Sequence, residues 1–72
     1  LGTQRMPNTF SVEITANSLY IRSGAGTGFK ATGVVKKGET HAISATDTAG
    51  TWGRLADGRG WISINSKYIR RI

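Results

Sequence analysis

The sequence predicts an all-β fold, a small barrel of five to seven short antiparallel strands. Short stretches of alternating apolar and polar residues recur along the chain, turn-forming residues separate them, and no window of about 11 residues has helical periodicity. The 72 residues make one small domain. A barrel is favoured over a sandwich because closure removes the exposed strand edges that a small sandwich would leave.

The start of the chain is expected to lie outside this domain. Residues 1–10 include the only proline and are predicted to be a linker or a vector-derived lead-in, and residues 11–72 are predicted to form the domain. The chain opens with Leu rather than Met, which predicts that it is a piece of a longer protein. No membrane span is expected, because no apolar run approaches the roughly 18 residues that one needs.

The first two strands are separated by a short turn. Every second residue is apolar from Phe10 onward, which predicts a strand over residues 10–15, and Asn-Ser at residues 17–18 predicts a turn. Residues 19–22 alternate again. This second alternation turns Tyr20 and Arg22 away from the core.

A glycine-rich loop is predicted at residues 23–32. Glycine occupies three of the five positions from Gly24 to Gly28 and gives the backbone unusual freedom. Loops on a rigid scaffold tend to carry binding, so this strand and loop predict a recognition groove. The loop does not match nucleotide-binding patterns, because Ala31 stands where the Walker pattern needs Ser or Thr and Phe29 replaces a required glycine.

Five further strands are predicted after the loop. The first begins at Val34 and ends in a tight turn at Gly38, and Asp57-Gly58 predicts a type I′ hairpin turn in which both residues have positive φ. The others are expected at residues 40–45, 52–55, 61–63 and 68–72, with a single 3₁₀ turn at residues 63–67.

The apolar faces of these strands are expected to form one core. The residues nominated for it are Ile14, Leu19, Ile21, Val35, Ile43, Leu55, Ile62 and Ile69, with Trp61 packed across one end. In residues 40–45, His41, Ile43 and Ala45 share one face, so His41 is predicted to lie at the rim of the core.

Composition argues against catalysis. Because there is no cysteine, disulfides, thiolate zinc sites and a cysteine nucleophile are excluded. The single histidine is a poor metal site and a poor base, and strand faces or turns explain each of the four acidic residues. We therefore expect no catalytic residue, no metal and no cofactor.

The chain is basic, with a formal net charge of +6. This charge favours an anionic partner such as nucleic acid, a membrane headgroup layer or an acidic wall polymer, although solubility alone also explains it. The basic residues are spread along the chain with no long block. A diffuse attraction is therefore expected rather than a dedicated phosphate track.

Four separated segments form a family pattern. They are Leu-Tyr-Ile-Arg-Ser-Gly-Ala-Gly at residues 19–26, Val-Val-Lys-Lys-Gly-Glu at residues 34–39, Trp52, and Gly-Trp-Ile at residues 60–62. Their order and spacing resemble the bacterial SH3 family, often called SH3b, over roughly residues 12–72. The chain looks most like the cell-wall-targeting modules at the C-terminal ends of clostridial autolysins and phage endolysins. Tyr20 departs from the family, which usually has Asn there, and adds a flat surface beside the glycine loop.

The resemblance implies an SH3-like β-barrel without catalytic activity that binds peptidoglycan or a related, anionic wall polymer. It implies an attached cell-wall hydrolase, such as an N-acetylmuramoyl-L-alanine amidase, an endopeptidase or a lysozyme-type glycosidase, and leaves open a tandem copy of the module. The expected location is extracellular, at the cell wall, in a secreted bacterial protein or a phage endolysin.

Seven residues are candidates for ligand contact: Tyr20, Arg22, Thr27, Phe29, Lys30, Trp52 and Tyr68. Tyr20 would stack on a sugar face or a peptide backbone, and Arg22 would present its donors to a stem-peptide carboxylate. Two of the seven have an alternative role within the fold. Arg22 would brace the loop by bonding its carbonyls, and Phe29 would tuck under the loop.

Two other kinds of partner are considered as alternatives to the cell wall. Small basic barrels with exposed aromatic residues bind single-stranded nucleic acid by stacking, although the scattered charges make this the weaker prediction. Recognition of a protein or peptide partner, such as a proline-rich peptide, is the second. It is disfavoured because no acidic residue lies between Arg22 and Glu39, where an acidic loop would be needed.

Overall fold

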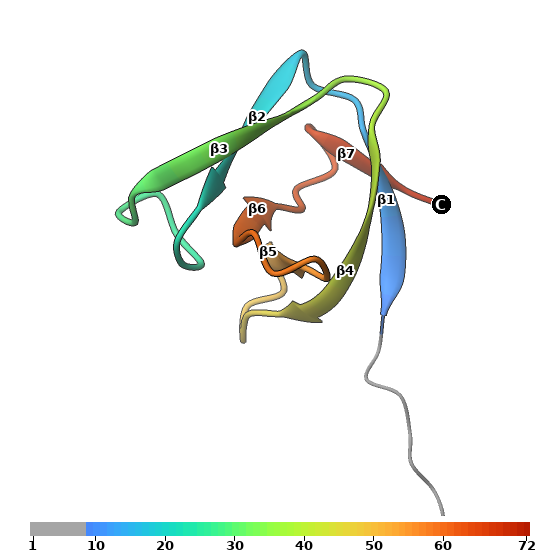
Figure 1. Cartoon of the computed structure of the whole chain (residues 1–72). Helices are drawn as coiled ribbons and strands as arrows, with labels where there is room; N and C mark the ends of the chain where they lie inside the picture. The colour runs from blue at the N-terminus through green and yellow to red at the C-terminus, as the bar shows by residue number, and fades with distance from the viewer. Residues whose placement is uncertain (1–8) are drawn as a thin grey trace, which may run out of the picture.

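The computed structural model describes residues 9–72, so most of the predicted lead-in at residues 1–10 lies outside the described residues. The described part contains seven strands, all paired antiparallel, which confirms the predicted all-β class (Figure 1). The strands are β1 (Phe10–Ile14), β2 (Ser18–Arg22), β3 (Ala31–Lys36), β4 (Thr40–Thr46), β5 (Trp52–Leu55), β6 (Trp61–Ser63) and β7 (Ile69–Arg71). No helix that could cross a membrane is found among residues 9–72.

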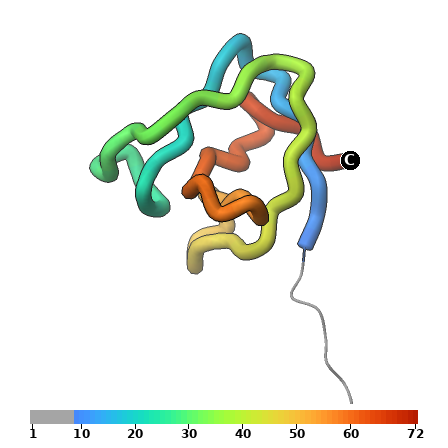
Figure 2. The backbone as a smooth tube through the Cα atoms, viewed as in Figure 1, coloured from blue at the N-terminus to red at the C-terminus, as the bar shows by residue number. Residues whose placement is uncertain are grey.

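One sheet contains all seven strands in the order β3-β2-β6-β5-β4-β1-β7. The sheet curls so that the β2–β3 hairpin lies across the molecule from β4 and β1 (Figures 1 and 2). Backbone bonds join the β3–β4 turn to the end of β1: Gly38 N–H donates to Ile14 O at 2.9 Å, and Ile14 N–H donates to Glu39 O at 2.9 Å. These bonds draw the curled sheet into the small SH3-like barrel that was predicted.

The core lies inside this curl and consists of β-branched residues and one leucine. The buried residues are Val12, Ile14, Ile21, Val35, Ile43, Leu55, Ile62, Ile64 and Ile69. Every nominated core residue is therefore buried except Leu19, which is half-buried against the cluster. Val12 and Ile64 were not nominated. Burying one such side chain contributes about 1.5–3 kcal/mol, so this cluster is the main source of stability.

Two local expectations are corrected by strand pairing. The glycine loop ends at Lys30 rather than residue 32, because Ser23 N–H donates to Lys30 O at 2.9 Å and Ala31 already pairs with Arg22. In β4, Ala45 does not share the core face of Ile43 but is exposed. A register shift between these two residues interrupts the alternation there.

The Asp57-Gly58 turn forms a hairpin between β5 and β6, but not of type I′. Gly58 has φ +85° and Gly60 has φ +141°, whereas no non-glycine residue of the described chain has positive φ. Gly58 N–H donates to Leu55 O at 3.0 Å, and Asp57 Oδ1 accepts from Arg59 N–H at 3.0 Å. This side-chain bond supports the wider turn that forms instead.

The last connection also differs from the expectation. Tyr68 was predicted to begin the closing strand, but β7 begins at Ile69 and Tyr68 ends a turn. In that turn Tyr68 N–H donates to Asn65 O at 2.9 Å. The single turn expected at residues 63–67 therefore lies at residues 65–68.

Candidate functional site

A groove of about 410 Å³ runs beside the outer surface of β2. We call it the aromatic groove. Its lining residues are Ser18, Leu19, Tyr20, Arg22, Thr27, Trp52, Ser63 and Tyr68. The structure thus brings together five of the seven predicted contact residues, namely Tyr20, Arg22, Thr27, Trp52 and Tyr68.

Strand alternation places the first wall of the groove. Tyr20 is 57% exposed while its neighbour Ile21 is buried, as the period of two in β2 predicts. A second wall of the groove comes from the β5–β6 hairpin, in which Trp52 and Ser63 pair directly across the two strands. Since β6 pairs with β2, the hairpin brings its residues to the same side of the sheet as Tyr20.

A backbone contact places Tyr68. Its carbonyl oxygen accepts hydrogen bonds from Thr15 N–H at 2.8 Å and from Ala16 N–H at 3.0 Å. These bonds hold the turn at residues 65–68 against the connection between β1 and β2. Tyr68 therefore reaches the groove beside Ser18, although 50 positions separate the two residues in the sequence.

Arg22 braces the glycine loop, which is one of the two roles weighed for it from the sequence, and it also lines the groove. Its Nη1 donates to Thr27 O at 3.3 Å and to Phe29 O at 3.0 Å, so the guanidinium braces the glycine loop. The same side chain lines the groove, with its guanidinium carbon 5.3 Å from the centre of the Tyr20 ring. The glycine loop, the Tyr20 ring and the Arg22 guanidinium are thus held together as one unit.

Phe29 and Lys30 do not line the aromatic groove. The Phe29 ring is 51% exposed, yet it lies against Gly24, where an added Cβ would come within 2.7 Å of it. It is therefore both exposed and packed on the loop. Lys30 is exposed, and its carbonyl closes the loop.

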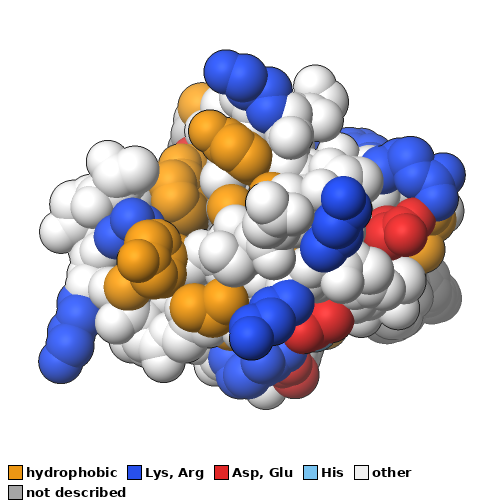
Figure 3. Space-filling model, turned by 90° about the horizontal axis from the view of Figure 1, so that it is seen from above, with side chains coloured by type: hydrophobic (Ala, Val, Ile, Leu, Met, Phe, Trp, Pro, Cys, Tyr) orange, Lys and Arg blue, Asp and Glu red, His pale blue; other side chains and the backbone are white. Residues whose placement is uncertain are grey.

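The groove carries positive charge and aromatic surface. Its lining residues include no Asp or Glu, and Arg22 is the charged one among them. Figure 3 shows hydrophobic side chains gathered in one part of the molecular surface, with lysine and arginine side chains on several sides of them. Such a surface suits a neutral or anionic ligand with apolar faces.

The single histidine lies away from the groove. His41 is half-buried, as predicted for a rim residue, and its Nε2 is 2.8 Å from Glu39 Oε1. Its Nδ1 lies 3.4 Å from Arg59 Nη2. Within residues 9–72, no three His, Cys, Asp or Glu side chains gather as metal ligands would.

Asp47 holds the start of β5, where Trp52 enters the groove. Its Oδ1 accepts hydrogen bonds from Trp52 N–H at 3.0 Å and from Thr51 N–H at 2.9 Å. The bond from the Trp52 amide, helped by the Thr51 amide, holds the pKa of the Asp47 carboxyl below its usual 3.8. Ionised Asp47 therefore stabilises the native chain.

We expect the free energy of unfolding to depend on this group in acid. Because the folded-state pKa is lowered, the stabilisation is complete above pH 3.8 and is lost as the pH falls through the lower, folded-state value. Asp47→Ala should be less stable than the parent at pH 6 and should approach it in acid. Thermal unfolding of both chains between pH 6 and pH 2 measures this, and parallel curves would contradict it.

A family model described as a bacterial SH3 domain matches residues 17–70. This range spans most of the chain and every residue that lines the aromatic groove. The chain belongs to the bacterial SH3 domain family. Comparison with curated proteins and with solved structures gives no significant match. Bacterial SH3 domains are generally noncatalytic binding modules and are often involved in cell-wall binding.

Sequence reasoning did not name three groove residues of this bacterial SH3 domain, Ser18, Leu19 and Ser63. Strand alternation could have predicted Ser18, because it lies two residues before Tyr20 and therefore shares its face of the strand. Ser63 lines the groove because it pairs with Trp52. That pairing depends on the hairpin register, which the residue pattern does not specify.

Proposed function

We propose that the domain is a noncatalytic module that binds peptidoglycan and targets an attached cell-wall hydrolase. The observation that carries this proposal is the aromatic groove, which combines three aromatic side chains, one guanidinium and no acid on its walls. Membership of the bacterial SH3 family supports the wall as the target.

The chemistry of the groove suits a glycan with attached peptides. Tyr20 and Tyr68, both exposed, present ring faces for the apolar side of a sugar or for a peptide backbone, with hydroxyl groups at their ends. Nη1 of Arg22 donates to carbonyl oxygens of the loop, and the other guanidinium nitrogens are available to donate hydrogen bonds to a stem-peptide carboxylate. Wall peptides end in such carboxylates.

Targeting would act through effective concentration. A hydrolase tethered to the module searches only the wall within reach of its linker, and avidity from such tethering can reach roughly 10²–10⁴. The attached enzyme would be an amidase, an endopeptidase or a lysozyme-type glycosidase of a secreted bacterial protein or phage endolysin. In that setting the module works outside the cell.

Sedimentation of the purified chain with Gram-positive sacculi tests the proposal. We expect the chain to pellet with sacculi at moderate salt, since the groove binds by stacking and hydrogen bonding as well as by charge. A chain that stays in solution while a known wall binder pellets would contradict the proposal. A parallel titration with single-stranded DNA examines the nucleic-acid alternative, which predicts tighter binding to DNA and a steep loss with salt.

A further inference from the structure

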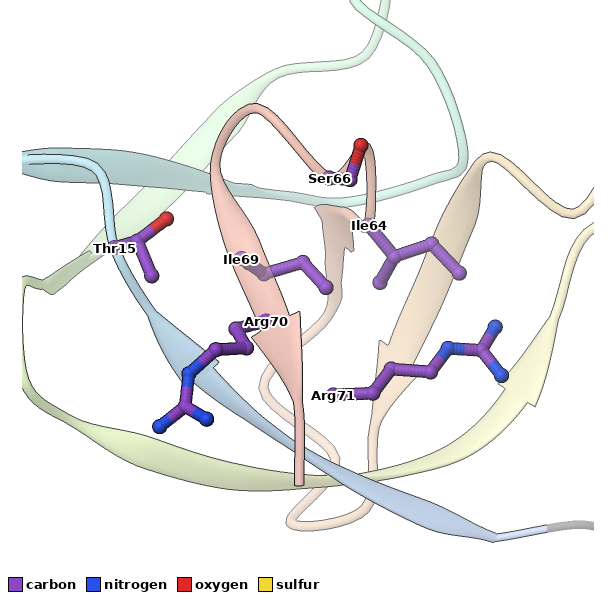
Figure 4. Close-up of a pocket in the computed structure, with 6 residues that line it drawn as sticks. All are labelled: Thr15, Ile64, Ser66, Ile69, Arg70 and Arg71. Carbon is purple, nitrogen blue, oxygen red and sulfur yellow. The ribbon is translucent and has the colours of Figure 1, made fainter.

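A second pocket, separate from the aromatic groove, opens beside β7. It has a volume of about 450 Å³ and is lined by Thr15, Ile64, Ser66, Ile69, Arg70 and Arg71. We call it the β7 pocket. Figure 4 shows the two isoleucines at its centre, the hydroxyl groups of Thr15 and Ser66 at one end, and the two arginine side chains diverging from β7 at the other.

The two arginines are held in different ways. Arg70 lies opposite Glu13 in the β1–β7 pairing and forms an ion pair with it. The Arg71 guanidinium carbon lies 4.0 Å from the centre of the Phe10 ring. Within residues 9–72, no carboxylate lies at ion-pair distance from Arg71, so the pocket keeps an uncompensated positive charge at this position.

We propose that the β7 pocket binds a polyanionic chain of phosphodiester-linked small polyols, as in the acidic polymers of Gram-positive walls. The inference rests on the proposed function for its setting and adds a second ligand to it. The Arg71 guanidinium would contact one phosphate, and Arg70, whose Nη2 is held by Glu13, would contact the next phosphate through its other guanidinium nitrogens. The hydroxyl groups of Thr15 and Ser66 would donate to phosphate oxygens. The short carbon units between phosphates would lie over Ile64 and Ile69.

The lining favours a polyol phosphate over a nucleic acid. Single-stranded nucleic acid is bound mainly by stacking of its bases on aromatic rings. The β7 pocket has no aromatic ring among its lining residues, and the ring of Phe10 is covered by Arg71. A polyol phosphate has no bases to stack, so the isoleucine floor suits it better.

The two sites adjoin through one turn. Ser66 lines the β7 pocket and Tyr68 lines the aromatic groove, and Lys67 is exposed between them. One module would therefore contact a wall glycan and a neighbouring anionic polymer at the same time. Lys67 would add a positive charge where the two ligands meet.

Calorimetric titration with a synthetic glycerol-phosphate oligomer tests the inference. We expect Arg71→Gln to weaken binding about fivefold, the factor that matches roughly 1 kcal/mol for one exposed charge pair. Ser66→Asp, which places a negative charge at an exposed position of the pocket, should weaken it at least as much. The matched control is Arg54→Gln, which removes the same charge from an exposed strand position that lines neither pocket.

Each outcome decides the inference. Equal affinity of Arg71→Gln and the parent, an equal loss in Arg54→Gln, or tighter binding of oligothymidylate than of the polyol phosphate would overturn it. A thermal unfolding curve for each variant shows that it is folded at the titration temperature. Sacculi from which the phosphate polymers have been removed separate the two proposals. Arg71→Gln should bind to these stripped sacculi as tightly as the parent chain does. If the parent chain itself does not bind to stripped sacculi, the result counts against wall binding by the aromatic groove and not against the β7 pocket.

Discussion

Replacing Gly60 by alanine is expected to lower the free energy of unfolding by about 3 kcal/mol, a sum of backbone strain and overpacking. Gly60 has φ +141°, and an added Cβ would overlap the carbonyl oxygen of Arg22 and lie 3.0 Å from Cγ2 of Ile21. The blocking atom is backbone. It belongs to the residue of β2 that pairs with Trp61, so it cannot move aside without disturbing the β2–β6 pairing.

The expected loss is large for a chain of this size, whose whole stability is roughly 4–10 kcal/mol. Urea unfolding followed by tryptophan fluorescence measures it. Gly58→Ala is the matched control, because Gly58 lies in the same hairpin with φ +85° but has open space where the Cβ would go. It should cost only about 1 kcal/mol, from backbone strain alone. Equal losses in the two variants would show that the contact with Arg22 has no effect.

Replacing Tyr20 by alanine is expected to weaken binding to sacculi about thirtyfold, which corresponds to roughly 2 kcal/mol for a central aromatic contact. The ring is 57% exposed and lines the aromatic groove, so its loss removes ligand surface and little of the core. It also removes the surface that faces the Arg22 guanidinium. The unfolding temperature should change only slightly.

Quantitative cosedimentation at fixed salt measures this loss. Val34→Ala is the matched control, because Val34 pairs directly with Tyr20 on the neighbouring strand and is 40% exposed but does not line the groove. It should bind sacculi like the parent. If Tyr20→Ala binds as well as Val34→Ala, the aromatic groove is not the wall-binding surface.

Much of the fold could be predicted because the signals are local. In β2, alternation predicted both the buried Ile21 and the exposed Tyr20. The same alternation predicts that Val12 is buried within β1. It also predicts that Ile64 is buried, because Ile62, Ser63 and Ile64 continue the alternation past the end of β6. These two residues could therefore have been nominated from the sequence.

Other features could not be predicted because they depend on a particular hydrogen bond or on the register between two strands. The Asp57-Gly58 pattern favours a two-residue turn, but the Asp57 side chain bonds to Arg59 N–H and a wider turn forms. In β4 a register shift against β5 exposes Ala45. The wider turn depends on a hydrogen-bond partner and the exposure of Ala45 depends on a partner strand, and an alternation pattern specifies neither.

The all-β class, the alternating core and the outward direction of the Tyr20 ring follow from the residue pattern alone, since side-chain direction along a strand follows from its period of two. Which side chains share a groove depends instead on how the strands and turns pack together in three dimensions. Tyr68 joins Tyr20 because its carbonyl accepts bonds from Thr15 and Ala16, and Phe29 is drawn onto Gly24 instead. Curling of the sheet brings strands that are distant in sequence together, and local periodicity carries no information about that closure.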